Sequence, residues 1–197
     1  MRHTRPLPHT HPEFSIIEYS GFCEYRVENW RLARDGSGRI VHGTVMWTWV
    51  DPVVPVVLSV IWQKLRWSVL IGIFLVLLTA VFIWFRCSQV LHESVLIFPQ
   101  YGIQLECHRG FPTLRPLFVS RRFIHLSTLQ DFVIHEGLRR WDVRYFLAIF
   151  KRSSSRDPLI EVAFENVWPH FAVLLEVYRG VHGSIFGEDI DFSEEPD

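Results

Sequence analysis

Residues 94–107 read SVLIFPQYGIQLEC, which is two apolar runs separated by a turn sequence. The runs at 94–98 and 103–107 are rich in strand-forming residues, and Pro99 and Gly102 are residues that favour turns. Gly102 can adopt backbone angles that side chains disfavour. The stretch therefore predicts a β-hairpin, and it sets the pattern for the chain that follows.

Further strand-like runs continue after this hairpin, separated by polar turns and by the loop at 151–158. They lie at residues 123–126, 132–135, 143–150 and 159–164. In the last run apolar residues alternate with mixed ones, which is typical of a strand with one buried face. Strand order does not follow from this pattern.

The spacing of apolar residues becomes helical after residue 166. Asn166 fits an N-cap, Pro169 fits a first turn, and Gly180 with Gly183 fits the end of an amphipathic helix. We therefore expect a small α+β domain over residues 87–185: an antiparallel sheet of five or six strands closed by a C-terminal amphipathic helix. Residues 186–197 carry six acidic side chains and no basic one, and we expect a disordered tail.

Upstream of the hairpin, residues 67–85 read WSVLIGIFLVLLTAVFIWF, without a charge. At about 1.5 Å per residue a helix of this length approaches the roughly 30 Å hydrocarbon core of a membrane. Trp67 and Trp84 fit interfacial aromatic positions, and Arg86 ends the run. The stretch predicts a transmembrane helix.

A second apolar run at 44–62 contains Asp51, Pro52 and Pro55. With the run that follows, it most simply forms a two-helix transmembrane hairpin over residues 43–86, with both termini on the cytosolic side by the positive-inside tendency. Alternatively, 44–62 is re-entrant or interfacial. If it crosses, Asp51 is an intramembrane polar residue that should face another helix; otherwise it is solvated near the headgroups.

Residues 1–42 contain a His/Pro-rich start, expected to be disordered, followed by an amphipathic stretch at 14–30. We expect this part to form an N-terminal cytosolic segment ahead of the hairpin. Histidines at the start of the chain are a weak metal-binding signal without a fixed scaffold, so no metal site is expected.

Chemical signatures are sparse. The sequence has no P-loop, GxGxxG, GxSxG or HExxH pattern, and its three cysteines form no CxxC pair, so no catalytic residue and no cofactor are expected. The formal net charge of −1 argues against a basic nucleic-acid binder. Basic residues near the apolar region are candidates for contact with anionic lipid headgroups, and these are Arg109, Arg115, Arg121 and Arg122.

The series of motifs resembles the PIG-H subunit family of the GPI N-acetylglucosaminyltransferase complex. The matching residues are Glu93-Ser94-Val95-Leu96-Ile97, Tyr101-Gly102-Ile103-Gln104, Phe123-Ile124, Leu129, Asp131, Val133-Ile134, Glu136, Tyr145-Phe146-Leu147, Val162, Phe164, Pro169 and Leu175-Glu176-Val177-Tyr178-Arg179. Their order and spacing behind a hydrophobic hairpin cover about residues 44–180. A sheet closed by a helix is also similar to pleckstrin-homology-like domains.

The resemblance implies a non-catalytic subunit, multi-pass in the endoplasmic reticulum membrane, with its termini and soluble domain in the cytosol. Its partners would be a separate catalytic glycosyltransferase subunit and the other subunits of a complex that transfers N-acetylglucosamine from UDP-GlcNAc to phosphatidylinositol. The candidates for partner contact are Tyr101, Gly102, Asp131, Glu136, Tyr178 and Arg179. The alternative is a free-standing, membrane-anchored module that binds phosphoinositides through the arginine-rich loop.

Overall fold

The structure is a computed structural model of the whole chain. It describes residues 1–7, 11–32, 40–42, 53–54, 56–60, 69–111, 115–139, 142–152 and 159–187. These residues fall into two compact units, and each is described by itself. The first unit contains residues 1–29, 92–107 and 120–197, and the second contains residues 30–91 and 108–119.

The largest element is a six-stranded sheet with the order β1-β2-β3-β6-β7-β8. Its strands are β1 (Arg2–Thr4), β2 (Phe14–Tyr19), β3 (Phe22–Glu28), β6 (Val90–Phe98), β7 (Gly102–Arg109) and β8 (Phe118–His125). The hairpin that residues 94–107 predict is present as β6 and β7, joined by a turn in which Tyr101 N–H donates to Phe98 O at 2.9 Å.

The N-terminal strands differ from the expectation of a separate N-terminal segment. β3 pairs with β6 in antiparallel register, with Tyr25 opposite Val95 and Val27 opposite Glu93. Even β1, in the stretch expected to be disordered, pairs with β2. The reason is that Phe14, Tyr25 and Val27 share one face of the sheet and are buried there with the downstream core. The N-terminal strands are thus part of the same sheet as the hairpin.

A second, three-stranded sheet has the order β11-β10-β9 and is antiparallel throughout. Its strands are β9 (Leu129–Arg139), β10 (Asp142–Lys151) and β11 (Leu159–Ala163), close to three of the runs expected from sequence. Leu147 lies opposite Ile134 and Ile149 opposite Phe132, so apolar side chains face the core in pairs.

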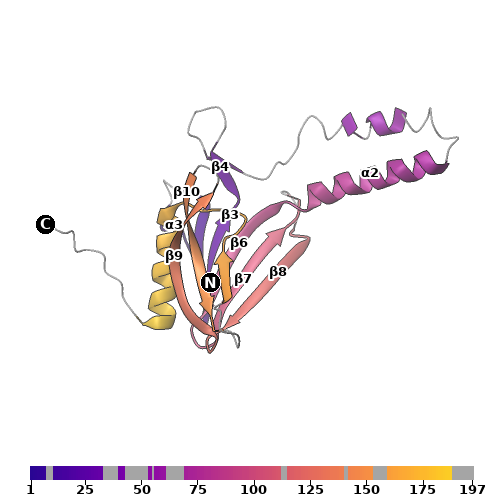
Figure 1. Cartoon of the computed structure of the whole chain (residues 1–197). Helices are drawn as coiled ribbons and strands as arrows, with labels where there is room; N and C mark the ends of the chain where they lie inside the picture. The colour runs from indigo at the N-terminus through magenta and orange to yellow at the C-terminus, as the bar shows by residue number, and fades with distance from the viewer. Residues whose placement is uncertain are drawn as a thin grey trace. The chain divides into compact units, whose positions relative to one another are not determined.

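The chain continues into α3 (Phe171–Val181), which is followed by a short π-helical segment, η1 (His182–Phe186). Figure 1 shows α3, in yellow, alongside β9. Val173, Leu174, Val177 and Val181 are buried in one core together with side chains from both sheets. The expected C-terminal helix is therefore present, but the strands after residue 87 are divided between two sheets and do not form the single sheet of five or six strands that was expected.

Two details of this helix differ from expectation. His170, not Asn166, occupies the N-cap position, and it makes no side-chain capping bond. The helix also continues through Gly180, where a Cβ atom would lie 1.9 Å from the Tyr25 hydroxyl oxygen. Gly180 therefore marks a close approach of α3 to the six-stranded sheet and does not end the helix. Of the expected tail, residues 188–197 lie outside the described residues.

The second unit contains β4 (Trp30–Leu32), β5 (Ile40–His42), helical residues at 53–54 and 56–60, and α2 (Val69–Cys87). Many apolar side chains of α2 are exposed, among them Leu70, Phe74 and Phe85 at 79%, 63% and 71%. In the part of the chain that is described, no helix meets the length and apolarity of a membrane span. The expected two-helix transmembrane hairpin over 43–86 is thus not confirmed, and Asp51, Pro52 and Pro55 lie outside the described residues.

The segment after β7 packs beside the end of α2, within the second unit. Gly110 N–H donates to Gln89 O at 2.9 Å, and the Arg86 guanidinium lies 5.9 Å from the centre of the Phe111 ring. The Trp84 and Phe118 rings have their centres 6.0 Å apart. Aromatic and basic side chains therefore gather where α2 ends.

Candidate functional site

A small pocket lies in the first unit where an edge of each sheet meets. It has a volume of about 30 Å³ and is lined by residues of β6, β7, β8 and β11, with Phe164 and Glu165 just after β11. β8 ends the order of the six-stranded sheet and β11 ends that of the three-stranded sheet. We call the region between these two strands the β8–β11 seam. The pocket has room for about one water molecule.

Glu93 is the most deeply buried charged group at the seam, with 5% of its surface exposed. Its carboxylate accepts hydrogen bonds from Asn166, at 2.5 Å from the side-chain amide and at 3.2 Å from the backbone N–H. The chain between β11 and α3 turns here through two residues with left-handed backbone angles, Phe164 and Trp168 (φ 58° and 54°). Glu93 thus holds a strained turn that leads into α3.

The other polar groups of the seam are an exposed ion pair and a buried hydroxyl. Arg122 of β8 lies 3.3 Å from Glu165, and both side chains are more than half exposed. Ser94 also lines the pocket and is 2% exposed. It lies directly opposite Arg26, so its side chain projects from the face of Arg26, and that of its neighbour Glu93 projects from the other face.

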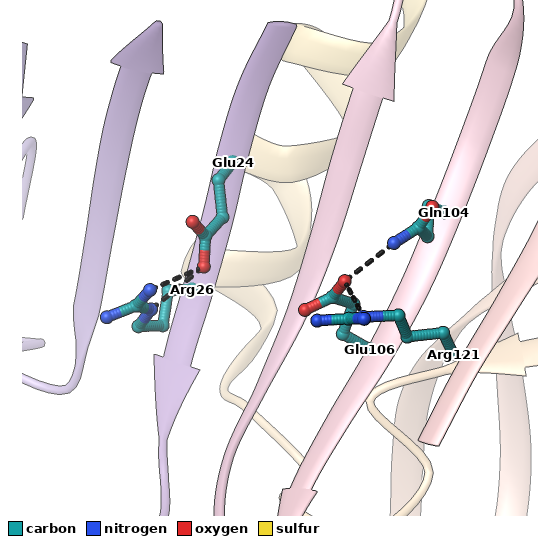
Figure 2. Close-up of polar contacts among 5 residues, drawn as sticks. All are labelled: Glu24, Arg26, Gln104, Glu106 and Arg121. Atoms are coloured by element: carbon teal, nitrogen blue, oxygen red, sulfur yellow. Dashed lines mark hydrogen bonds and ion pairs between the residues drawn. The ribbon is translucent and has the colours of Figure 1, made fainter. Parts of the chain in front are cut away.

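A second polar group lies on one face of the six-stranded sheet. Arg26 contacts Glu24 at 2.8 Å, while Glu106 accepts hydrogen bonds from Gln104 at 2.6 Å and from Arg121 at 2.8 Å. Figure 2 shows these five side chains on the face of the sheet turned away from α3, which lies behind the strands. Each arginine has a carboxylate partner, so this face is polar with little net charge.

The four arginines expected at lipid headgroups therefore have different surroundings. Arg121 and Arg122 are not in a loop, because β8 contains both, and both are ion-paired. Arg109 ends β7 and Arg115 follows it, and both are exposed with no acidic partner among the described residues.

The candidates for partner contact lie on three separate elements, and none of them lines the pocket. Tyr101, in the turn between β6 and β7, is 62% exposed. Gly102 is buried, has φ of 139°, and a Cβ atom there would lie 2.1 Å from Ile124 O. Gly102 is accordingly required by the close approach of two backbones, and it has no surface to offer a partner.

The remaining four candidates lie on β9 and α3. Glu136 and Arg179 are exposed, and Asp131 is half-buried with its Oδ1 accepting the Phe132 N–H at 2.7 Å. The ring of Tyr178 packs on that of His182, with centres 4.2 Å apart. His182 in turn lies 2.8 Å from Phe132 O through its Nε2. Tyr178 is therefore part of the contact between α3 and β9.

Sequence reasoning missed Glu93 and Asn166 as members of one site. Glu93 carries a signal, because it is a carboxylate inside a strand and the four residues after it are buried. Its partner Asn166 lies 73 residues further along the chain, and no local pattern joins the two.

Comparison with known proteins gives a family match for the part of the chain that contains the seam. Residues 94–165 match the family model described as "GPI-GlcNAc transferase complex, PIG-H component". The predicted resemblance to the PIG-H family is confirmed over this stretch. The PIG-H stretch begins within β6 and ends at Glu165, so it includes both strands of the β8–β11 seam.

A curated protein is also similar to the chain. The phosphatidylinositol N-acetylglucosaminyltransferase subunit gpi15 of Schizosaccharomyces pombe is 34% identical over 92 residues, which are 47% of this chain and 53% of the relative. The chain thus spans about half the length of this curated relative. No solved structure matches the chain.

Proposed function

We propose that the chain is a non-catalytic subunit of the complex that transfers N-acetylglucosamine from UDP-GlcNAc to phosphatidylinositol, the first step of GPI-anchor biosynthesis. The observation that carries this proposal is the PIG-H match over residues 94–165, together with the name of the relative from Schizosaccharomyces pombe. These residues build the whole three-stranded sheet and, in the six-stranded sheet, β7, β8 and most of the length of β6.

The chemistry of the site supports an accessory role. Pockets that bind small molecules have volumes of roughly 300–1,000 Å³. The pocket at the seam, at about 30 Å³, is too small for a nucleotide sugar. Glu93 is bonded to Asn166, Glu165 to Arg122 and Glu106 to Arg121, which is an arrangement that stabilises a fold. The transfer reaction is assigned to a partner subunit.

We propose that this partner, the catalytic glycosyltransferase subunit, contacts the exposed members of the predicted contact set. Tyr101 and Glu136 are exposed on the first unit, and so is Arg179. Asp131 is retained as a weaker candidate. Gly102 and Tyr178 are proposed to act indirectly, by holding the turn and the helix that carry their neighbours.

We also propose attachment to the endoplasmic reticulum membrane through α2, as part of the two-helix hairpin expected from sequence, with the sheet domain in the cytosol. The exposed apolar side chains of α2 support this attachment. Further support comes from Trp84, Arg86 and Phe118 at one end of the helix, because aromatic and basic side chains are typical of the membrane interface.

Affinity purification tests the subunit proposal. The full chain with an affinity tag, solubilised in mild detergent, should recover a glycosyltransferase, and cells lacking the chain should fail to convert UDP-GlcNAc and phosphatidylinositol in isolated membranes. Recovery of the chain alone, with normal transfer in the deletion cells, would contradict the proposal. Extraction with alkaline carbonate tests attachment, since an inserted chain stays with the membrane pellet and a peripheral one is released.

A further inference from the structure

β8 and β11 are both edge strands, and they flank the same pocket. In the described part of the chain neither has a hydrogen-bonded strand on its outer side. A strand edge presents alternating N–H and C=O groups, which another extended chain can pair with. The β8–β11 seam therefore has the backbone chemistry of a site for strand addition.

The side chains at the seam do little to prevent such pairing. Phe123 on β8 is 48% exposed, and Leu159 and Ile160 on β11 are 53% and 52% exposed. Edges that avoid association are usually very short or bear proline, a bulge or an inward-pointing charge. β8 has eight residues, no proline and no acidic side chain. Its charges are Arg121 and Arg122, which project from opposite faces of the strand because neighbouring side chains alternate.

One polar observation indicates what an added chain would carry. The Arg122 side chain is 52% exposed and its present partner, Glu165, is 61% exposed. An exposed ion pair contributes only about 0–1 kcal/mol, so a carboxylate on an incoming chain can replace Glu165 at little cost.

We propose that β8 receives an extended strand from a partner subunit, which pairs with its free edge and adds a further strand to the six-stranded sheet. The incoming strand places a carboxylate beside Arg122 and, next to it, an apolar side chain beside Phe123. Main-chain hydrogen bonds supply affinity in this mode of binding, and side chains at alternate positions supply specificity. The inference rests on the proposed subunit role and names the surface that role uses.

Hydrogen–deuterium exchange tests the surface directly. The full chain is measured alone and in the assembly recovered by affinity purification. Exchange of the outward amides of β8 should slow by about tenfold or more in the assembly, because an added strand protects them. The turn at residues 20–21, between β2 and β3, serves as a region whose exchange should not change.

Proline substitution tests the same edge by function. Adjacent residues of a strand direct their N–H groups to opposite sides. One of the two variants Ser120→Pro and Arg121→Pro therefore removes a hydrogen bond to β7, and the other removes only an N–H group on the outer edge. The tolerated variant is recognised by an unchanged unfolding midpoint, and it should lose the partner in purification. The alanine variant at the same position, Ser120→Ala or Arg121→Ala, is the matched control, because it changes the side chain but keeps the backbone N–H, and it should retain the partner.

The outcomes separate the two proposals. Recovery of no partner overturns the subunit role and this inference together. Recovery of the partner with unchanged exchange in β8 overturns the strand-addition inference alone. Protection of β8 that depends on the concentration of the isolated chain would assign the edge to a second copy of this chain, and it would also overturn the inference. If neither proline variant folds, the exchange result decides.

Discussion

The Glu93 carboxylate on β6 accepts hydrogen bonds from both the side chain and the backbone of Asn166, which lies between β11 and α3. One buried charge thereby joins the six-stranded sheet to the turn that precedes the C-terminal helix. The turn contains Phe164 and Trp168 in left-handed conformations, so it needs external support to persist.

Glu93→Gln tests this support. The amide keeps the size of the side chain but loses the charge and one acceptor oxygen, and hydrogen bonds to charged groups contribute about 1.5–3 kcal/mol. We expect the free energy of unfolding to fall by an amount in this range, measured by urea denaturation of the full chain. Glu165→Gln removes a carboxylate that is 61% exposed, and its effect should be within about 0.5 kcal/mol of zero. Equal effects of the two changes would contradict the role of Glu93.

Gly102→Ala tests the close approach of the turn between β6 and β7 to β8. A Cβ atom at residue 102 would meet the backbone oxygen of Ile124 at 2.1 Å, and φ is 139°. Gly21 is the matched control, because its φ is also positive, at 116°, but nothing lies within 4 Å of its Cβ position. Backbone strain costs about 1–3 kcal/mol at either site, and only Gly102→Ala adds a clash. Thermal unfolding should show the larger loss for Gly102→Ala, and similar losses would argue against the clash.

Gly180→Ala tests the packing of α3 on β3. The new methyl group would lie 1.9 Å from the Tyr25 hydroxyl, so either α3 or the Tyr25 ring must move. We expect a loss of about 1–3 kcal/mol, as for other overpacked cores. Gly183→Ala, with open space around its Cβ position, should cost little. Circular dichroism and denaturant unfolding distinguish the two variants.

Alkaline pH should destabilise the first unit through Cys23 and Tyr25. Burial raises the pKa of the Cys23 thiol above its ordinary value of 9.0, and burial, followed by the nearby Cys23 charge, raises the pKa of the Tyr25 phenol above 10.0. The unfolded chain therefore releases these protons first. The stabilisation is complete below about pH 9 and is lost as pH rises above it.

Urea unfolding at about pH 8 and about pH 10.5 measures this dependence. The double variant Cys23→Ala with Tyr25→Phe should show a smaller decrease between the two pH values than the unchanged chain. Tyr145→Phe is the control, because Tyr145 is 43% exposed. An unchanged decrease in the double variant would show that other groups control the alkaline transition.

Vesicle sedimentation separates the two pairs of arginines, and with them the phosphoinositide-binding alternative. Arg109 and Arg115 have no acidic partner among the described residues, whereas Arg121 and Arg122 are ion-paired. Binding to vesicles with anionic lipid should weaken more on changing Arg109 and Arg115 to Gln, because each unpaired basic residue near a membrane surface contributes about 1 kcal/mol. Headgroup-selective binding lost with Arg121→Gln and Arg122→Gln would instead favour the phosphoinositide-binding module.

Sequence patterns were sufficient to predict those features that depend on residues close together in the chain. The turn at Pro99 and Gly102 and the amphipathic spacing of α3 depend on neighbours within a few residues, and both were predicted. The later strands were predicted in part, since β8 begins at Phe118 and the expected run began at residue 123. Asn166 was assigned as a helix cap because its type and position suit one. Its side chain instead binds Glu93, and a contact across 73 residues leaves no local trace.

The N-terminal strands were missed for a similar reason. β2 and β3 form a short antiparallel pair, and such a pair is marginal in water unless it joins a larger sheet. The strand that β3 pairs with is β6, which lies beyond the apolar region. The composition of residues 1–42 therefore does not indicate that they pair with β6. Likewise, Arg121 and Arg122 were expected in a loop because charge suggested exposure, although an edge strand exposes its side chains equally well.

The pairing of β3 with β6 limits the path of the residues that connect these two strands. Glu28 lies directly opposite His92, so the chain leaves the sheet before residue 30 and returns to the adjacent strand after residue 90. Two hydrogen-bonded strands must lie in the same compartment, so Glu28 and His92 lie on the same side of any membrane. The sheet also cannot be completed until the ribosome has synthesised β6, so β3 has no partner on that side while residues 30–90 are being made.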